Sequence, residues 1–489
     1  MSIKYEEILK YNEKGKYRGE WDSLTGYTIP EWFCGAKFGI FIHWGVFSVP
    51  AFGNEWYSRN MYVQGSPEFE HHVKTYGPQK KFGYKDFIPM FKAEKFDPEY
   101  WAEVFAQSGA KYVVPVAEHH DGFQMYESDL SEFCAGKMGP KRDVIGELKK
   151  SVEKRGLVFG ASTHRAEHAW FMGVGKEFDS DIHEPLKRGD FYWPSEETQP
   201  DFQDLHAKPD PPEEFLIDWV ERTCEIVDKY SPRILYFDWW IEHEAYKPYL
   251  RTIMAYYYNR GLERGFPTSV CYKHDACAFG SAVVDVERGK FAEAKPYHWQ
   301  TDTAIARNSW CYTDSLIYKS SDEIIRYLAD VVAKNGNLLL NVGPKADGTF
   351  AGEDLSILLD IGEWLKVNGE AIYDTKAWRY AEEGPTKEEE GQFCDGSATE
   401  YTSKDIRFTA GNGAIYAIVL KAPEDGKFTI KSVSKSADPW KPAFHGLIRS
   451  VSILGEKGEE EFEVDENGLT FTHKGIKTKF PVVVKIETE

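Results

Sequence analysis

The chain has 489 residues, which exceeds one typical domain and suggests two or three. Its formal net charge of −20 would repel phosphate backbones and anionic lipid, which argues against nucleic-acid and membrane-surface roles and favours a neutral ligand. Aromatic residues make up 15% of the chain, and their flat apolar rings suit dense cores as well as sugar recognition.

The N-terminal stretch MSIKYEEILKYNEKGK lacks the apolar core of a secretory signal, and no run of eighteen apolar residues occurs. The seven cysteines are odd in number and form no C-x-x-C pair, as expected for reduced thiols. We therefore expect a cytoplasmic protein that makes no membrane contact. A homo-oligomer is compatible with these features.

Short β-branched and aromatic runs alternate with helical segments through the first 375 residues. Such alternation is typical of a parallel sheet with both faces covered, and seven or so strands favour a (β/α)₈ barrel over an open sheet. The expected strands are 37–45, 111–123, 157–168, 233–240, 267–275, 282–289 and 337–344. The expected helices are 96–110, 141–156, 215–232, 246–261, 321–336 and 353–374.

The pattern of apolar and polar residues changes after the last of these helices. Segments such as DIRFTAG, AIYAIVLKAP and FPVVVKIETE alternate apolar and polar residues with a period of two, and turn residues separate them. This pattern is typical of an antiparallel β-sandwich. The sequence therefore predicts a catalytic barrel over 1–375 and a C-terminal β-sandwich over 376–489.

Each expected barrel strand ends in a polar cluster. Because the carboxyl ends of barrel strands meet on one face, where active sites are built, these clusters should surround one pocket. A core histidine satisfied by a backbone carbonyl is the alternative for His43. The clusters are His43-Trp44, His119-His120-Asp121, His164-Arg165, Asp238-Trp239-Trp240, Lys273-His274-Asp275 and Glu287-Arg288.

A metal site is a minor alternative. Neighbouring residues on a strand point to opposite sides, so His119 and His120 should rarely serve one ion. The run HRAEH places His164, Glu167 and His168 at the spacing of an H-x-x-E-H zinc motif, but that motif belongs on a helix and this copy follows a strand.

Two carboxylates carry a sharper signal. Asp238 follows the apolar run RILYF and precedes two tryptophans, and a buried acid in such a setting is usually functional or ion-paired. Glu287 ends another strand. Hydrolysis of a glycosidic bond needs two acids, one to attack or to activate water and one to protonate the leaving oxygen. In the alternative interpretation, Glu287 simply pairs with Arg288.

Six segments together resemble the α-L-fucosidases of glycoside hydrolase family 29, and the resemblance covers nearly the whole chain in order. The combination of FGIFIHWG with a downstream EWY and HHDGF is highly specific. The six segments are 30–62, 118–133, 235–240, 283–289, 298–312 and 335–349.

The resemblance implies a retaining exo-glycosidase that removes terminal α-L-fucose from oligosaccharides or glycoconjugates and needs no metal or organic cofactor. It assigns Asp238 as the nucleophile and Glu287 as the acid/base, with Glu293 and then Asp285 in reserve. Phe41 and Trp310 should enclose the C6 methyl group of fucose. The expected substrate contacts are Phe41, His43, Glu55, Trp56, His119, His120, Tyr236, Lys273 and Trp310.

The sequence departs from the common family pattern in three places. Glu118 stands where a lysine is frequent, Tyr236 stands where many members have tryptophan, and STHRAEHAW replaces a segment that usually ends in Glu-Trp. Two other activities are compatible with the residues: hydrolysis of a related sugar such as α-L-galactose, and sugar binding without catalysis. The linkage preference depends on loops such as 170–214.

Overall fold

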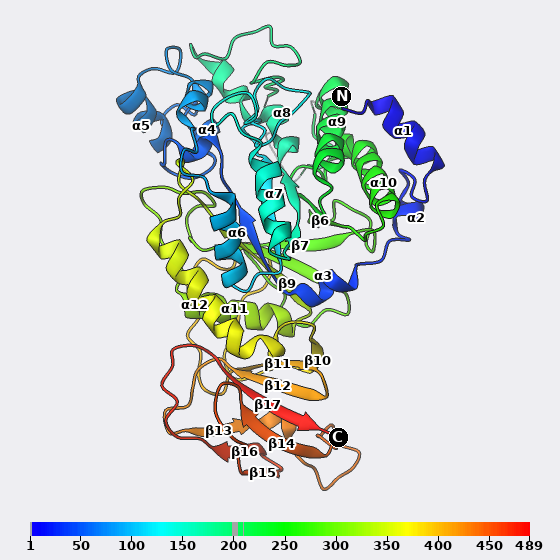
Figure 1. Cartoon of the computed structure of the whole chain (residues 1–489), viewed down its shortest axis with the longest axis vertical. Helices are drawn as coiled ribbons and strands as arrows, with labels where there is room; N and C mark the ends of the chain where they lie inside the picture. The colour runs from blue at the N-terminus through cyan, green and yellow to red at the C-terminus, as the bar shows by residue number, and fades with distance from the viewer. Residues whose placement is uncertain (1, 198–203, 209) are drawn as a thin grey trace.

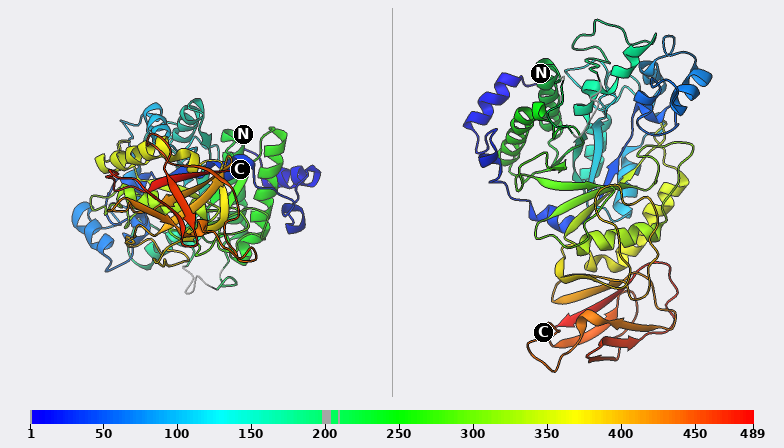
Figure 2. Two further views of the ribbon diagram at one scale, coloured as in Figure 1. Left: turned by 90° about the horizontal axis from the view of Figure 1, so that it is seen from below. Right: turned by 180° about the vertical axis from the view of Figure 1, so that it is seen from behind.

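The computed structural model describes residues 2–197, 204–208 and 210–489, so part of the long 170–214 loop lies outside the described residues. Two bodies are evident: a helix-covered barrel and a smaller all-β unit, which lies below helices α11 and α12 in Figure 1. The same arrangement is seen from behind in Figure 2. The predicted fold class, a (β/α)₈-like barrel followed by an antiparallel sandwich, is confirmed.

Parallel strands form the barrel. Within the described residues the strand order is β1-β9-β8-β7-β6-β5-β4-β2-β3, and a further β1–β2 pairing closes the ring. Strands β3 and β4 are two short pieces of one barrel strand, so the closed barrel has eight strand positions. The strands are β1 (Phe38–Ile42), β2 (Tyr112–Glu118), β3 (Val158–Phe159), β4 (Ala161–Thr163), β5 (Ile234–Phe237), β6 (Ser269–Lys273), β7 (Val283–Glu287), β8 (Trp299–Ala304) and β9 (Gly336–Val342).

The expected barrel strands all form, but the sequence interpretation missed one. Strand β8, with the sequence WQTDTA, follows β7 without an intervening helix and carries polar residues inside the barrel. Gln300 is completely buried and bonds to Asp285, while Asp302 pairs with Lys273. Because these polar side chains satisfy one another inside the barrel, the strand lacks the apolar run that marks its neighbours.

Helices cover the outside of the barrel, and local sequence sets their ends. Asp97 caps α6 by accepting hydrogen bonds from the backbone amides of Glu99 and Tyr100, and Pro98 occupies the first helical position. The main helices are α1 (Tyr5–Lys14), α3 (Glu31–Ala36), α5 (Pro67–Tyr76), α6 (Pro98–Gln107), α7 (Val144–Lys154), α9 (Glu213–Tyr230), α10 (Lys247–Glu263), α11 (Ser321–Ala333) and α12 (Gly352–Asn368). Short helices are α2 (Trp21–Leu24), α4 (Tyr57–Asn60) and α8 (His168–Phe171).

The C-terminal unit consists of two antiparallel sheets around a separate apolar core. One sheet has the order β10-β11-β12-β17-β14 and the other β13-β16-β15. Both β10 and β15 were missed by the sequence interpretation. The strands are β10 (Lys376–Glu383), β11 (Ile406–Gly411), β12 (Ala414–Val419), β13 (Lys427–Ile430), β14 (Ile448–Ile453), β15 (Phe462–Asp465), β16 (Gly468–Thr472) and β17 (Val482–Thr488).

A buried ion cluster joins the sandwich to the barrel. Arg407 of β11 bonds to Asp330 of α11, and Lys334 lies 2.9 Å from the same carboxylate. Lys290 lies beyond the end of β7, and its ammonium group is 2.6 Å from the carboxylate of Glu388, which follows β10. Removing one member of a buried cluster leaves an uncompensated charge, so these contacts tie the two units firmly together.

A segment after β10 returns to the barrel. We call residues 388–395 the strap. Its Gly391 pairs with Lys290 in an antiparallel bridge, which places part of the chain after residue 375 directly against the catalytic unit. The domain boundary at 375/376 stays a prediction.

All seven cysteines are unpaired, as expected for reduced thiols. In the described part of the chain, no helix combines the length and the apolar character needed to cross a bilayer. The cytoplasmic location and the oligomeric state stay predictions.

Candidate active site

A cavity of about 620 Å³ lies at the carboxyl ends of the barrel strands. Its lining brings together seven of the nine predicted substrate contacts and both predicted catalytic acids. A larger cavity of about 700 Å³ lies between α11 and the sandwich and contains none of them. The lining of the smaller cavity is Phe41, His43, Asn54, Glu55, Trp56, Arg59, Asn60, His119, His120, His164, Glu167, Trp170, Asp238, Trp239, Trp240, Glu242, Glu287, Asp302, Trp310 and Phe393.

His43 lies in this pocket, whereas the neighbouring Trp44 does not. The backbone amide of His43 bonds to Asn341 Oδ1, and its ring Nδ1 lies 2.7 Å from the same oxygen. Trp44 turns the other way, packs in the core against Trp101 and donates to the carbonyl of Lys345. The expectation that both residues form the rim is therefore wrong for Trp44: although β1 ends at Ile42, these two side chains still point to opposite sides, as neighbours on a strand do.

The same rule fails for His119 and His120, which both line the pocket with ring centroids 4.3 Å apart. Strand β2 ends at Glu118, so this pair lies in the turn that follows rather than on the strand. Burial keeps the pKa of His43 and of His119 well below the usual histidine value, so both rings are neutral at physiological pH.

An aromatic wall closes one side of the pocket. The rings of Phe41 and Trp310 lie 6.3 Å apart, and Trp310 stacks on His43 at 5.2 Å. Glu55 fixes the wall by accepting a hydrogen bond from the Trp310 amide at 3.0 Å. Trp56 packs edge-on against His120. All six residues in these contacts are predicted substrate contacts.

Asp238 lies among basic groups just beyond β5. His164 Nδ1 is 2.9 Å from its Oδ2, and His120 Nε2 is 3.4 Å away. Burial alone would raise the pKa of Asp238, but His164, His120 and Lys273 hold it well below its usual range. Asp238 is therefore an ionised carboxylate facing the pocket, as a nucleophile must be.

Glu287, at the end of β7, behaves in the opposite way. Burial, helped by the nearby carboxylates of Asp302 and Asp238, raises the pKa of Glu287 to about 7, although Lys273 opposes the rise. Its Oε2 accepts a hydrogen bond from the Trp239 indole and lies 3.0 Å from Lys273 Nζ. A carboxyl group with this pKa can hold a proton and donate it near neutral pH.

The alternative in which Glu287 serves as the partner of Arg288 is wrong. The Arg288 guanidinium turns away, stacks over Trp310 at 4.4 Å and lies 3.7 Å from Asp395 of the strap. Glu293 is exposed and outside the pocket lining, and Asp285 is buried against Lys273 and Gln300. Neither reserve acid faces the cavity.

Lys273 and Tyr236 lie beneath the pocket rather than in its lining. Lys273 binds Glu287 and Asp302, both at 3.0 Å, and Tyr236 donates to Asp302 at 2.9 Å. Although burial lowers the pKa of Lys273, the surrounding carboxylates of Asp302, Glu287 and Asp285 raise it above its usual value. The position of these two residues suits orientation of Glu287 and Asp302, and their predicted role as substrate contacts stays a prediction.

Four further lining residues were given no catalytic or substrate-binding role from the sequence: Glu167, Glu242, Asp302 and Trp170. Burial raises the pKa of Glu167 to about 8 and that of Glu242 to about 7. Within the described residues, five lining side chains have a buried atom without a hydrogen-bond partner: His119 Nδ1, His164 Nδ1, Glu167 Oε2, Trp170 Nε1 and Glu242 Oε2. Those of His164 and Glu167 lie beside charged groups, 2.9 Å from Asp238 and 3.7 Å from His120. Orphaned polar atoms are costly, and a ligand rich in hydroxyl groups could satisfy them.

The HRAEH run does not form a zinc motif of the expected kind. His164 pairs with Asp238, Glu167 lies 3.7 Å from His120, and His168 bonds to the His120 carbonyl. In the described part of the chain, the donor groups close enough to share a metal ion are His43-His119-His164 and His120-His164-Asp238. His164 lines the pocket, as its position after a barrel strand predicts, whereas Arg165 of the same cluster does not.

The Glu118 departure is explained by its surroundings. Its side chain lies outside the pocket and binds Arg165 at 2.6 Å and Arg222 at 3.1 Å. Both arginines also bind Asp218 of α9. The acid at position 118 therefore belongs to a buried ion network that supports the HRAEH segment.

A parallel barrel in which an ionised carboxylate and a carboxyl group of raised pKa face one pocket is the arrangement that retaining glycoside hydrolases use. Residues 6–370 match the family model described as alpha-L-fucosidase. The chain therefore belongs to the α-L-fucosidase family.

Relatives and solved structures agree. Tissue alpha-L-fucosidase of Homo sapiens is 32% identical over 466 residues, which cover 94% of this chain and 88% of that protein. The crystal structure of Thermotoga maritima alpha-fucosidase is 32% identical, with a TM-score of 0.73 over 96% of this chain and 100% of that one. The same enzyme in complex with fucose has a TM-score of 0.73 at 31% identity, covering 96% and 100%.

Proposed function

We propose that this protein is an exo-acting, retaining α-L-fucosidase that releases terminal fucose from oligosaccharides or glycoconjugates. The observation that carries the proposal is the opposite electrostatic setting of Asp238 and Glu287 in one pocket. Paired carboxyl groups whose surroundings push their pKa values apart supply a nucleophile and an acid. A panel of aryl α-L-glycosides and fucosylated oligosaccharides tests the activity.

The reaction proceeds by two displacements. Asp238 attacks the anomeric carbon while Glu287 gives its proton to the leaving oxygen, so the glycosidic bond breaks and a fucosyl-enzyme ester forms. Glu287 then takes a proton from water, which attacks the same carbon and releases fucose with retained configuration. Lys273 and Trp239, both bonded to Glu287, hold its carboxyl group in place through both steps.

Selectivity for fucose should come from the aromatic wall. Fucose carries a methyl group where galactose-type sugars carry a hydroxymethyl group, and Phe41 and Trp310 offer an apolar surface for it. A pocket discriminates one such group by about 1–3 kcal/mol. We expect an aryl α-L-fucoside to exceed the matching α-L-galactoside in kcat/KM by roughly ten- to two-hundredfold. Equal kcat/KM values would mean that the wall does not contact this position.

Activity should fall on the alkaline side as Glu287 loses its proton. Its pKa of about 7 in the free enzyme predicts that kcat/KM for a substrate with a poor leaving group declines above pH 7. Asp238 stays ionised far into the acid range, so its titration sets no limit near neutrality. The measurement is a kcat/KM profile from about pH 4 to pH 9.

A matched dinitrophenyl fucoside provides the control for this profile. Dinitrophenolate leaves without protonation, so kcat/KM for this substrate should decline much less steeply above pH 7. An equally steep decline with both substrates would assign the limb to another group, such as Glu167 or Glu242.

A further inference from the structure

The strap, residues 388–395, is bonded to the chain around the acid/base. The backbone amide of Phe393 donates to the carbonyl of Glu287, and the amide of Cys394 donates to the carbonyl of Arg288, both at 2.9 Å. Gly391 and Lys290 exchange two backbone hydrogen bonds of 2.8 and 3.1 Å. The strap is therefore bonded by its backbone to the chain at the carboxyl end of β7, next to Glu287.

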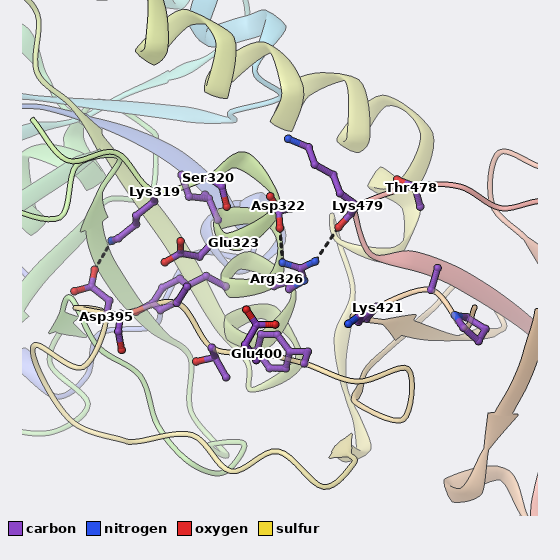
Figure 3. A pocket seen from close by; sticks show the side chains of 18 of the residues that line it. Lys319, Ser320, Asp322, Glu323, Arg326, Asp395, Glu400, Lys421, Thr478 and Lys479 are labelled. Carbon is purple, nitrogen blue, oxygen red and sulfur yellow. Dashed lines mark hydrogen bonds and ion pairs between the residues drawn. The ribbon is translucent and has the colours of Figure 1, made fainter. Parts of the chain in front are cut away.

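Side chains anchor the far end of the strap in the larger cavity. Asp395 accepts hydrogen bonds from Lys319 and Thr303, and Figure 3 shows the Lys319–Asp395 contact at the edge of that cavity. Both charged groups are buried, and Arg288 lies 3.7 Å from the same carboxylate. These contacts fix the backbone two residues from Phe393.

Phe393 is held in a costly position. Its backbone φ is +55°, a left-handed conformation that bulky residues rarely adopt, and 58% of its surface is exposed to solvent. Neither burial nor backbone preference accounts for a phenylalanine here. Strained residues of this kind cluster at binding and catalytic sites, where other contacts maintain them.

The ring of Phe393 continues an aromatic surface that begins at the acid/base. It lies nearly parallel to Trp239, with an interplanar angle of 12° and ring centroids 6.2 Å apart. Trp239 in turn donates its indole N–H to Glu287 Oε2 and packs edge-on against His274. Both rings line the active-site cavity.

Chemistry requires the leaving group to lie beside these rings. Glu287 protonates the glycosidic oxygen, so the sugar attached to that oxygen must lie next to Glu287 on the side away from fucose. Phe393 and Trp239 extend from Glu287 along the pocket lining, and pyranose rings offer flat apolar faces to aromatic surfaces. The pocket wall formed by Phe41 and Trp310 is assigned to fucose itself under the proposed function.

We propose that Phe393 and Trp239 form a binding subsite for the leaving-group sugar, so that the C-terminal part of the chain sets the preference for the glycan from which fucose is removed. This inference rests on the proposed fucosidase function and assigns Phe393 as a specificity-determining residue. The subsite takes a neutral pyranose joined to fucose, and also a free sugar that acts as acceptor for the fucosyl-enzyme.

Two variants separate the ring from the backbone conformation. Phe393→Gly removes the ring and relieves the left-handed strain, whereas Phe393→Tyr keeps an aromatic face. Each is assayed with α-L-fucosyl fluoride, whose leaving group is one atom, and with the fucosyl-lactose isomer that the enzyme hydrolyses fastest. The matched control is Trp440→Ala, which removes a 91% exposed aromatic residue of the sandwich outside both cavities.

The kcat/KM for fucosyl-lactose should fall roughly three- to tenfold more than that for fucosyl fluoride in Phe393→Gly, because one aromatic contact is lost. Phe393→Tyr should restore most of the difference, and Trp440→Ala should leave the ratio of the two values unchanged. The thermal midpoint of Phe393→Gly should equal or exceed that of the parent protein.

Transfer to lactose gives a second readout. With fucosyl fluoride as donor, the lactose hydroxyl gives its proton to Glu287 and its oxygen attacks the fucosyl-enzyme, which releases Asp238. The ratio of fucosyl-lactose to free fucose should fall by the same factor in Phe393→Gly. Equal losses on both substrates with an unchanged transfer ratio would overturn the subsite. Failure of the parent protein to hydrolyse fucosyl fluoride would instead overturn the fucosidase function.

Discussion

Replacing Asp238 with glycine should reduce turnover by several orders of magnitude with every leaving group, because the covalent intermediate cannot form. The carboxylate is held ionised by His164 at 2.9 Å and His120 at 3.4 Å, and no good leaving group substitutes for the missing nucleophile. Turnover of dinitrophenyl and aryl fucosides by the variant measures the loss.

Azide should distinguish loss of the nucleophile from general damage. In Asp238→Gly it can occupy the vacated space and attack directly, and this single displacement gives the inverted β-fucosyl azide. Glu242→Gly is the matched comparison, because Glu242 is a second acid that lines the same pocket but is assigned no step in the proposed reaction. If Glu242→Gly lost as much activity as Asp238→Gly, and only Glu242→Gly formed β-fucosyl azide, then Glu242 would be the nucleophile.

Replacing Glu287 with alanine should make the rate depend strongly on the leaving group. Dinitrophenyl fucoside needs little protonation, so fucosylation stays fast and the intermediate accumulates, whereas natural oligosaccharides become poor substrates by about 10²- to 10⁴-fold. Steady-state rates over a series of aryl fucosides check this, and burst kinetics detect the accumulating intermediate.

Azide again reports the role, with the opposite stereochemistry. It should intercept the fucosyl-enzyme from the second face and give the retained α-fucosyl azide. Near-normal rates of Glu287→Ala on natural oligosaccharides would contradict the assignment. Glu167 would then be tested first, because it lines the pocket and burial raises its pKa to about 8, while Glu293 lies outside the pocket.

Most of the barrel was predictable because apolar strands and amphipathic helices have distinct periods. The positions of Asp238 and Glu287 were predictable for the same reason: each follows an apolar strand, and parallel strand ends converge. Strand β8 was not, because its buried Gln300 bonds to Asp285 and its Asp302 pairs with Lys273, so the strand has no apolar run.

Other parts of the site depend on contacts between distant segments. Lys273 reads as one more polar strand end, yet it lies beneath Glu287, where three carboxylates surround it. Phe393 is more than 100 residues from Glu287 in sequence, and no local pattern announces the backbone pairing that joins them. Long-range pairing of this kind is invisible to periodicity.

The ion cluster of Arg407, Asp330 and Lys334 limits which domain exchanges and substitutions this enzyme can tolerate. Arg407 of the sandwich and Lys334 of the barrel share the Asp330 carboxylate, so separating the two units would remove one partner from a buried charge on each side. A chain fusion or domain exchange at residue 375 would have to replace Arg407 together with its partners. Substitutions on the two sides of the junction are therefore expected to be tolerated only as matched sets.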